Sequence, residues 1–120
     1  MVFKTKDIAG SGIVIITSPK RIDVNVSDEL RDLISDIIGK PKYNIIIDLS
    51  DTEYIDSSGL GSIVARISVL RSNSGDIRLA APGKSVMNLL KLTHLNQILK
   101  TYENVEQAVG SFTSVQGKKI

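Results

Sequence analysis

A run of three isoleucines, Ile45-Ile46-Ile47, followed by Asp48 and Leu49, is the feature that most constrains the fold of this chain. The run is short, β-branched and bounded by polar residues, which is typical of a strand rather than a helix. An uninterrupted apolar strand needs cover on both faces, and this favours a central place in a sheet flanked by helices. We therefore expect residues 44–49 to form a buried strand of an α/β domain.

Other predicted strands and helices alternate around this run. A tight turn at Gly10-Ser11-Gly12 separates the first two strands and predicts a hairpin. The predicted strands are residues 3–8, 12–17, 44–49, 76–80 and 98–102. Helical patterns follow the second, third, fourth and fifth of them, so the order is β-β-α-β-α-β-α-β-α. This order predicts one α/β domain with a mixed, mostly parallel sheet, an N-terminal hairpin and about four helices.

The ends of the first helix are predicted from residue types. Ser27 is a good N-cap residue, and the acids Asp28 and Glu29 would follow it in the first turn. Gly39 and Pro41 are expected to end this helix.

The later helices are predicted from apolar spacing. One helix is expected from near residue 57 to Asn73, because its apolar residues share one face: Leu60, Ile63, Val64, Ile67 and Leu70. A third helix is predicted over residues 85–92, and Asn104 is expected to cap a fourth over residues 105–110. We expect a domain over residues 1–112 and a frayed tail over residues 113–120.

Composition excludes several classes of function. The 120 residues have room for one domain, and the absence of cysteine rules out disulfides, thiolate zinc sites and cysteine nucleophiles. The single histidine, His94, is expected to be a surface or capping residue rather than a catalytic base. A net charge of +2 and 4% aromatic residues disfavour direct nucleic-acid binding. No apolar run is long enough to span a membrane or serve as a signal segment, so we expect a cytoplasmic protein without membrane association.

Motifs for catalysis and phosphate binding are incomplete. The Gly-x-Ser-x-Gly pattern of serine hydrolases does not occur. Gly59-Leu60-Gly61 lacks the third glycine of a dinucleotide-binding loop, and Gly83-Lys84-Ser85 lacks the first glycine of a P-loop. We therefore expect neither an enzyme nor a protein with a metal or cofactor of its own.

The segment Asp56-Ser57-Ser58-Gly59-Leu60-Gly61 is the strongest candidate for a functional site. It is predicted to lie at a helix N-terminus, exposed and with unsatisfied backbone N–H groups. Two glycines in one helical turn suggest that bulk is excluded there, by close packing or by a docking partner. The segment could be an ordinary helix cap. Alternatively it is a phosphorylation switch, in which a phosphoserine adds charge to a surface that a partner covers. Four acids would add to this negative charge if they cluster near the segment: Asp23, Asp51, Glu53 and Asp56.

The chain resembles the anti-sigma factor antagonists of the STAS domain family over about residues 3–112. The resemblance rests on the strand 45–49, the segment 54–61 and the later stretch 81–86. It implies a protein that, when unphosphorylated, binds an anti-sigma factor with serine kinase activity and so releases a sigma factor. It also implies that the kinase modifies Ser57 and that a serine phosphatase reverses the modification. Ser58 remains a second candidate, and the residues before Asp23 depart from the family pattern.

The resemblance also suggests which residues meet the partner: Asp23, Asp56, Ser57, Ser58, Gly59, Leu60 and Gly61. Leu60 could equally belong to the core. The expected assembly is a monomer or weak dimer. A stressosome-like or lipid-transport scaffold subunit is one alternative, which a large particle in sedimentation would favour. A small nucleotide-binding module is another, which saturable binding of ATP or GTP without a partner would favour.

Overall fold

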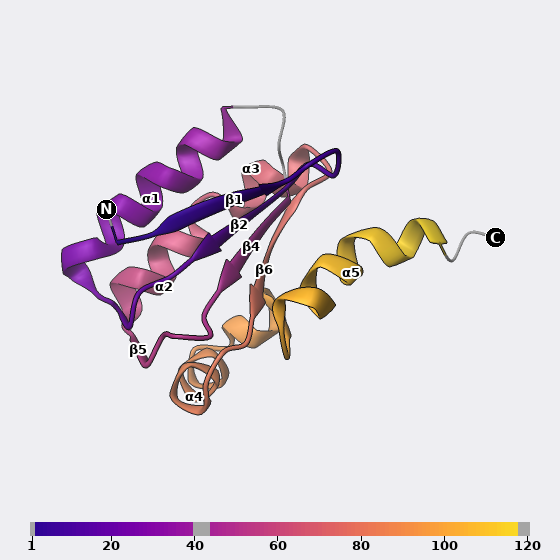
Figure 1. Ribbon diagram of the computed structural model, residues 1–120. Coiled ribbons are helices and arrows are strands. Elements are labelled where there is room, and N and C mark those ends of the chain that lie inside the picture. The colour runs from indigo at the N-terminus through magenta and orange to yellow at the C-terminus, as the bar shows by residue number, and fades with distance from the viewer. Residues whose placement is uncertain (1, 40–43, 118–120) are drawn as a thin grey trace.

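The computed structural model describes residues 2–39 and 44–117 (Figure 1). Its main sheet has five strands in the order β1-β2-β4-β6-β7. Their bounds are Lys4–Ile8 (β1), Ile13–Thr17 (β2), Asn44–Asp48 (β4), Asp76–Ala80 (β6) and Lys100–Tyr102 (β7). The hairpin strands β1 and β2 pair antiparallel, and the other neighbours pair parallel. The predicted mixed, mostly parallel sheet is therefore confirmed, and the isoleucine run lies in its central strand, β4.

Helices cover both faces of this sheet. They are α1 (Val24–Ile38), α2 (Ser57–Val64), α3 (Ile67–Ser72), α4 (Lys84–Leu92) and α5 (Val105–Gly117), with a 3-10 turn at Leu95–Gln97. Residues of α1 to α4 pack with the sheet in one apolar core, and α5 packs on the opposite face in a second core (Figure 1). Ile45 and Ile47 of β4 point into the first core and Ile46 into the second, which explains the uninterrupted isoleucines.

The first helix begins four residues earlier than predicted. Asp23, not Ser27, is its N-cap residue, and the Asp23 carboxylate accepts a hydrogen bond from the Asn25 N–H at 3.0 Å. Ser27 is buried inside the helix, so Asp28 and Glu29 do not lie in its first turn. Gly39 is the C-cap residue as expected, whereas Pro41 lies outside the described residues.

The predicted second helix is two helices. The chain leaves helical geometry at Arg66, where φ is −114° and ψ is 6°, and α3 begins at the next residue. The apolar face continues across this break, because Ile63 and Leu70 both belong to the main core. The break therefore changes the backbone without changing which side chains are buried.

The C-terminal elements also differ from the prediction at their ends. Ile98 precedes the last strand instead of belonging to it, and the last helix continues from Val105 to Gly117. This helix passes the point at which a frayed tail was expected, and residues 118–120 lie outside the described residues. Asn104 caps the helix as predicted, since its side chain accepts a hydrogen bond from the Gln107 N–H at 2.7 Å.

A second, two-stranded sheet was not predicted. Its strands, β3 (Arg21–Ile22) and β5 (Tyr54–Ile55), pair parallel and lead directly into α1 and α2. Ile22 and Ile55 are buried in the main core, so this small sheet is fixed to the rest of the domain. It sets the positions of the two helix N-termini that form the candidate site.

Candidate functional site

The N-termini of α1 and α2 lie side by side because their preceding strands are paired. Ile22 pairs with Ile55, and the next residue in each chain segment is the N-cap aspartate, Asp23 or Asp56. The Asp56 N–H donates to the Ile22 carbonyl at 3.2 Å, which fixes this alignment. Figure 1 shows both helices starting near β5. The predicted residues Asp23 and Asp56 are thus brought together on one surface, which we call the double tip (residues 23–24 and 56–58).

Asp56 satisfies the N-terminus of α2 with its own side chain. Its Oδ1 accepts hydrogen bonds from the backbone N–H groups of Ser58 at 3.0 Å and Gly59 at 3.1 Å. The Ser58 hydroxyl donates to the same oxygen at 2.5 Å. The expectation of unsatisfied N–H groups at these two positions is therefore wrong. The Ser58 hydroxyl first, and then the two N–H donors, lower the pKa of the Asp56 carboxyl below its ordinary value of 3.8, against an opposing effect of desolvation.

The two serines at the tip have different surroundings. Ser57 is the first residue of α2 and is exposed, and within the described residues its hydroxyl forms no hydrogen bond. Ser58 is half-buried and its hydroxyl is bound to Asp56. A group that approaches from solvent can therefore reach the Ser57 hydroxyl without breaking a contact within the domain, whereas the Ser58 hydroxyl must first leave a carboxylate.

The two glycines of the segment also differ. A Cβ atom at Gly59 would lie 2.7 Å from the Ile22 Cγ2 and 2.8 Å from the Ile22 carbonyl oxygen. Close packing against β3 and β5 thus accounts for Gly59. A Cβ atom at Gly61 would have nothing within 4 Å, and the residue is exposed. Packing within the domain gives no reason for glycine at position 61.

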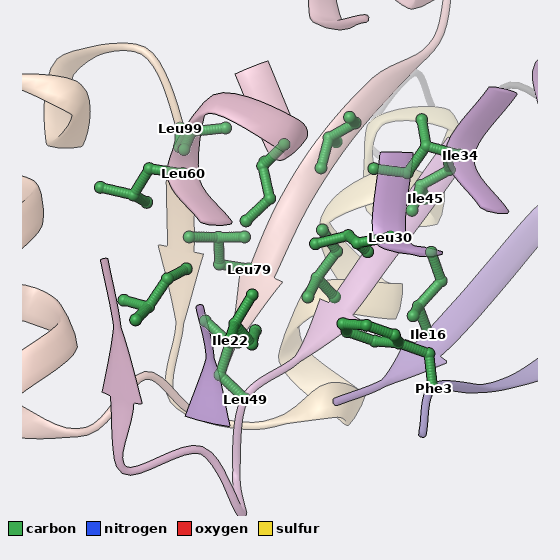
Figure 2. Packing of buried hydrophobic residues seen from close by; sticks show 14 of the residues in the cluster. Phe3, Ile16, Ile22, Leu30, Ile34, Ile45, Leu49, Leu60, Leu79 and Leu99 are labelled. Atoms are coloured by element: carbon green, nitrogen blue, oxygen red, sulfur yellow. The ribbon is translucent and has the colours of Figure 1, made fainter. Parts of the chain in front are cut away.

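Leu60 belongs to the core and not to the surface of the tip. Its side chain is 3% exposed and lies in the main apolar cluster, which also contains Leu99 (Figure 2). Of the residues expected to meet a partner, Leu60 is therefore corrected to a core residue. Gly59 is also buried, and its role is to let α2 approach the small sheet.

A buried serine joins the two helices of the double tip. The Ser62 hydroxyl lies 2.8 Å from the Ser27 carbonyl of α1 and 3.1 Å from the Ser58 carbonyl of its own helix. Ser62 is fully buried, so its hydroxyl has no access to water. It holds α2 against α1 four residues after Ser58 and was not predicted from the sequence, where serine in a helix carries no such signal.

One exposed apolar side chain lies in the double tip and another lies close to it in the chain. Val24 follows Asp23 and is 69% exposed, and Tyr54 lies two residues before Asp56 and is 40% exposed. The Arg21 guanidinium stacks on the Tyr54 ring at 4.2 Å from its centroid, and its Nε lies 3.5 Å from an Asp23 carboxylate oxygen. Tyrosine and arginine are enriched at protein–protein interfaces, and here they lie together beside the tip. Sequence reasoning did not assign Val24 or Tyr54 to the site.

The remaining sequence candidates, Ser85 and His94, lie at the start of α4 and beside the 3-10 turn. The Ser85 hydroxyl of the Gly83-Lys84-Ser85 stretch donates to the Glu53 carbonyl at 2.9 Å, which ties the start of α4 to the segment before β5. His94 is exposed, with a φ of 62°, at the start of the 3-10 turn. Within residues 2–39 and 44–117, no group of three or more histidine, cysteine, aspartate or glutamate side chains could hold a metal ion.

No helix in the described part of the chain is both long enough and apolar enough to cross a bilayer. Asp51 and Glu53 are both exposed in the segment before β5, on either side of the buried Thr52.

Known proteins match this chain in sequence and in fold. A Thermotoga maritima protein, provisionally named an anti-sigma factor antagonist, is 32% identical over 98 residues, which cover 81% of this chain and 87% of the relative. A crystal structure of such a protein from Thermotoga maritima matches with a TM-score of 0.85 and 28% identity, covering 92% and 94% of the two chains. The structure of the anti-sigma factor antagonist SpoIIAA in its unphosphorylated form has the same fold, with a TM-score of 0.79, 22% identity and coverage of 96% of each chain. The sequence model of the STAS domain matches residues 6–108, and this chain belongs to the STAS domain family.

Proposed function

We propose that this chain is an anti-sigma factor antagonist whose binding is switched off by phosphorylation of Ser57. The unphosphorylated protein binds an anti-sigma factor that is also a serine kinase, and a sigma factor is released for transcription. A serine phosphatase returns the protein to its binding form. The chain acts in the cytoplasm as a binding switch and not as an enzyme. The names of the matched relatives support the antagonist function.

The surroundings of Ser57 favour it over Ser58 as the modified residue. Its hydroxyl is exposed at the first position of α2, and the neighbouring Ser58 hydroxyl is bound to the Asp56 carboxylate at 2.5 Å. A kinase can transfer a phosphoryl group to Ser57 without first dismantling the cap of α2. This difference supports Ser57 as the acceptor and Ser58 as part of the cap.

Charge explains why the modification would release a partner. A phosphate adds about −1.5 to −2 charges, next to an Asp56 carboxylate that already accepts the Ser58 and Gly59 N–H groups. The helix N-terminus therefore has less capacity left to stabilise the phosphate. A docked partner that covers this phosphate removes it from water, and a charge left buried without a partner costs several kcal/mol. A hundredfold loss of affinity needs only about 2.7 kcal/mol, so one unpaired phosphate under a docked partner is sufficient.

A kinase assay with two single variants tests this proposal. The wild type, Ser57→Ala and Ser58→Ala are incubated with the anti-sigma factor kinase of the same organism and ATP, and the modified peptide is located by mass spectrometry. We expect phosphate on Ser57 in the wild type and in Ser58→Ala. Ser57→Ala should take up none and should stay bound to the kinase in the presence of ATP.

Thermal unfolding of each variant shows whether its fold is retained. If Ser57→Ala accepts phosphate at the wild-type rate, Ser57 is not the acceptor and the proposed switch is wrong.

A further inference from the structure

A groove adjoins β5, the strand that leads into the double tip. It lies between β5 and α4, has a volume of about 290 Å³, and is lined by Tyr54, Ile55, Ser85, Asn88, Leu89 and Leu92. Most of its large side chains are apolar. Leu92, at the C-terminal end of α4, is 78% exposed, more than any other large apolar side chain in the described part of the chain. Leu92 and Tyr54 thus place two exposed side chains at the edges of one apolar groove, where a partner side chain can bury them together.

The groove and the double tip are linked by β5, which lines the groove and leads into α2. Tyr54 forms one wall of the groove and lies three residues before Ser57, on the strand that leads into the double tip. The Ser85 hydroxyl bonds to the Glu53 carbonyl and so keeps the first turn of α4 next to this strand. The groove wall at Tyr54 is therefore adjacent in the chain to the surface that a partner of Ser57 would cover.

The α4 side of the groove is positively charged. The helix Lys84–Leu92 contains two lysines and no acidic residue, and both lysines are exposed. Lys84 and Lys91 each precede a lining residue, Ser85 and Leu92 respectively. On the β5 side, Arg21 stacks on Tyr54, and Glu53 is the acidic residue that borders this wall in the chain. Charge complementarity therefore favours carboxylates in the partner on the α4 side.

We infer that the anti-sigma factor kinase inserts a large apolar side chain, flanked by carboxylates, into the groove between Tyr54 and Leu92. This inference rests on the proposed function and extends it, because it adds α4 to the surface that recognises the partner. The groove supplies affinity and the double tip supplies the switch, so the two parts can be weakened separately.

Truncation of Leu92 tests the apolar contact. Binding of the purified anti-sigma factor kinase of the same organism, with ADP, is measured by calorimetry for the wild type, Leu92→Ser, Val69→Ser and Ser57→Asp. Val69 is a matched control because it is an exposed apolar residue, 42% exposed, on α3. We expect Leu92→Ser to weaken binding at least tenfold and Val69→Ser to change it less than twofold. Leu92 is mostly exposed, so thermal unfolding of Leu92→Ser should match that of the wild type.

The outcomes separate this inference from the proposed function. If Ser57→Asp loses binding while Leu92→Ser keeps the wild-type affinity, the groove contact is wrong and the proposed switch stands. If Leu92→Ser loses binding while Ser57→Asp keeps it, the groove contact is supported and the switch is wrong. If the wild type does not bind the kinase, both are wrong.

Charge reversal on α4 tests the acidic flank. Lys91→Glu should slow association with the kinase at low salt at least threefold, and the difference should shrink as salt is added. Lys6→Glu, an exposed position on β1, is the matched control and should leave the rate unchanged. An association rate of Lys91→Glu equal to or above that of the wild type would overturn the carboxylate part of the inference.

Discussion

Replacing Gly59 by alanine tests how tightly the switch helix is held against the small sheet. The new Cβ atom would lie 2.7 Å from the Ile22 Cγ2, 2.8 Å from the Ile22 carbonyl oxygen and 2.9 Å from the Ile55 Cγ1. A side-chain methyl group could rotate away, but a backbone oxygen cannot. The same carbonyl accepts the Asp56 N–H at 3.2 Å, so a displaced helix would also strain the bond that aligns the two tips.

The size of the effect follows from two opposing contributions. Overpacking a well-filled site costs about 1–3 kcal/mol, and alanine recovers up to about 1 kcal/mol relative to glycine in a helix. Because a backbone oxygen is one of the obstacles, we expect a cost in the upper half of that range, so Gly59→Ala should lower the free energy of unfolding by about 1–2 kcal/mol. Gly61→Ala is the matched control, because nothing lies within 4 Å of its Cβ position. It should raise the free energy of unfolding by up to about 1 kcal/mol.

Urea denaturation followed by far-ultraviolet circular dichroism measures both variants, since the chain has no tryptophan for fluorescence. The midpoints should move in opposite directions at an unchanged slope. A Gly59→Ala protein that is as stable as the wild type would show that the contact with Ile22 does not explain this glycine. Gly61→Ala also tests binding. If the partner covers this position, the variant should bind the kinase more weakly although it is more stable.

Two further substitutions test the cap and the helix contact. Asp56→Ala should lower the free energy of unfolding by about 1 kcal/mol at pH 7. The pKa of the Asp56 carboxyl in the folded protein is lowered from 3.8, so the ionised carboxylate stabilises the fold above that pH and loses this effect as the pH falls through the folded pKa. The difference in stability between wild type and Asp56→Ala should therefore shrink below about pH 4. A difference that does not change with pH in denaturation experiments would refute this. Ser62→Ala should cost about 1–2 kcal/mol, because it removes a buried donor to the Ser27 carbonyl. Unchanged stability in the same assay would show that Ser62 does not hold the two helices together.

The layout of the sheet could be predicted because its strands have strong local signals. The isoleucine run identified the central strand, and the turn at Gly10-Ser11-Gly12 identified the hairpin, where Gly10 and Gly12 have φ values of 76° and 74°. These left-handed conformations are ones that glycine adopts readily. Local residue types predicted these two elements because β-branched residues favour strands and glycine favours tight turns, and both are found there.

The wrong predictions concern features that local residue types do not mark. Ser27 and Asp23 are both good N-cap residues, and only the pairing of β3 with β5 selects Asp23. That pair was missed because two-residue strands are too short to show a period. The break at Arg66 was missed because the apolar face of the helix continues through it.

The candidate site was predicted only in part, because several of its features depend on neighbours in space. The segment 56–61 and Asp23 were identified, and the structure brings Asp23 and Asp56 together. Gly59 and Gly61 are alike in sequence and differ only in their neighbours in space, so their separate roles could not be read from the chain. Val24 and Tyr54 are ordinary residues in sequence, and only their exposure beside the tip marks them.

The direct test of the switch is the affinity of one protein in its two covalent states. The chain is phosphorylated by the anti-sigma factor kinase, purified, and shown by mass spectrometry to carry a single phosphate. The dissociation constants of the modified and unmodified proteins for the same kinase are then measured side by side. A phosphate on Ser57 should weaken binding at least about a hundredfold, or about 2.7 kcal/mol. Equal affinities for the two forms would contradict the account.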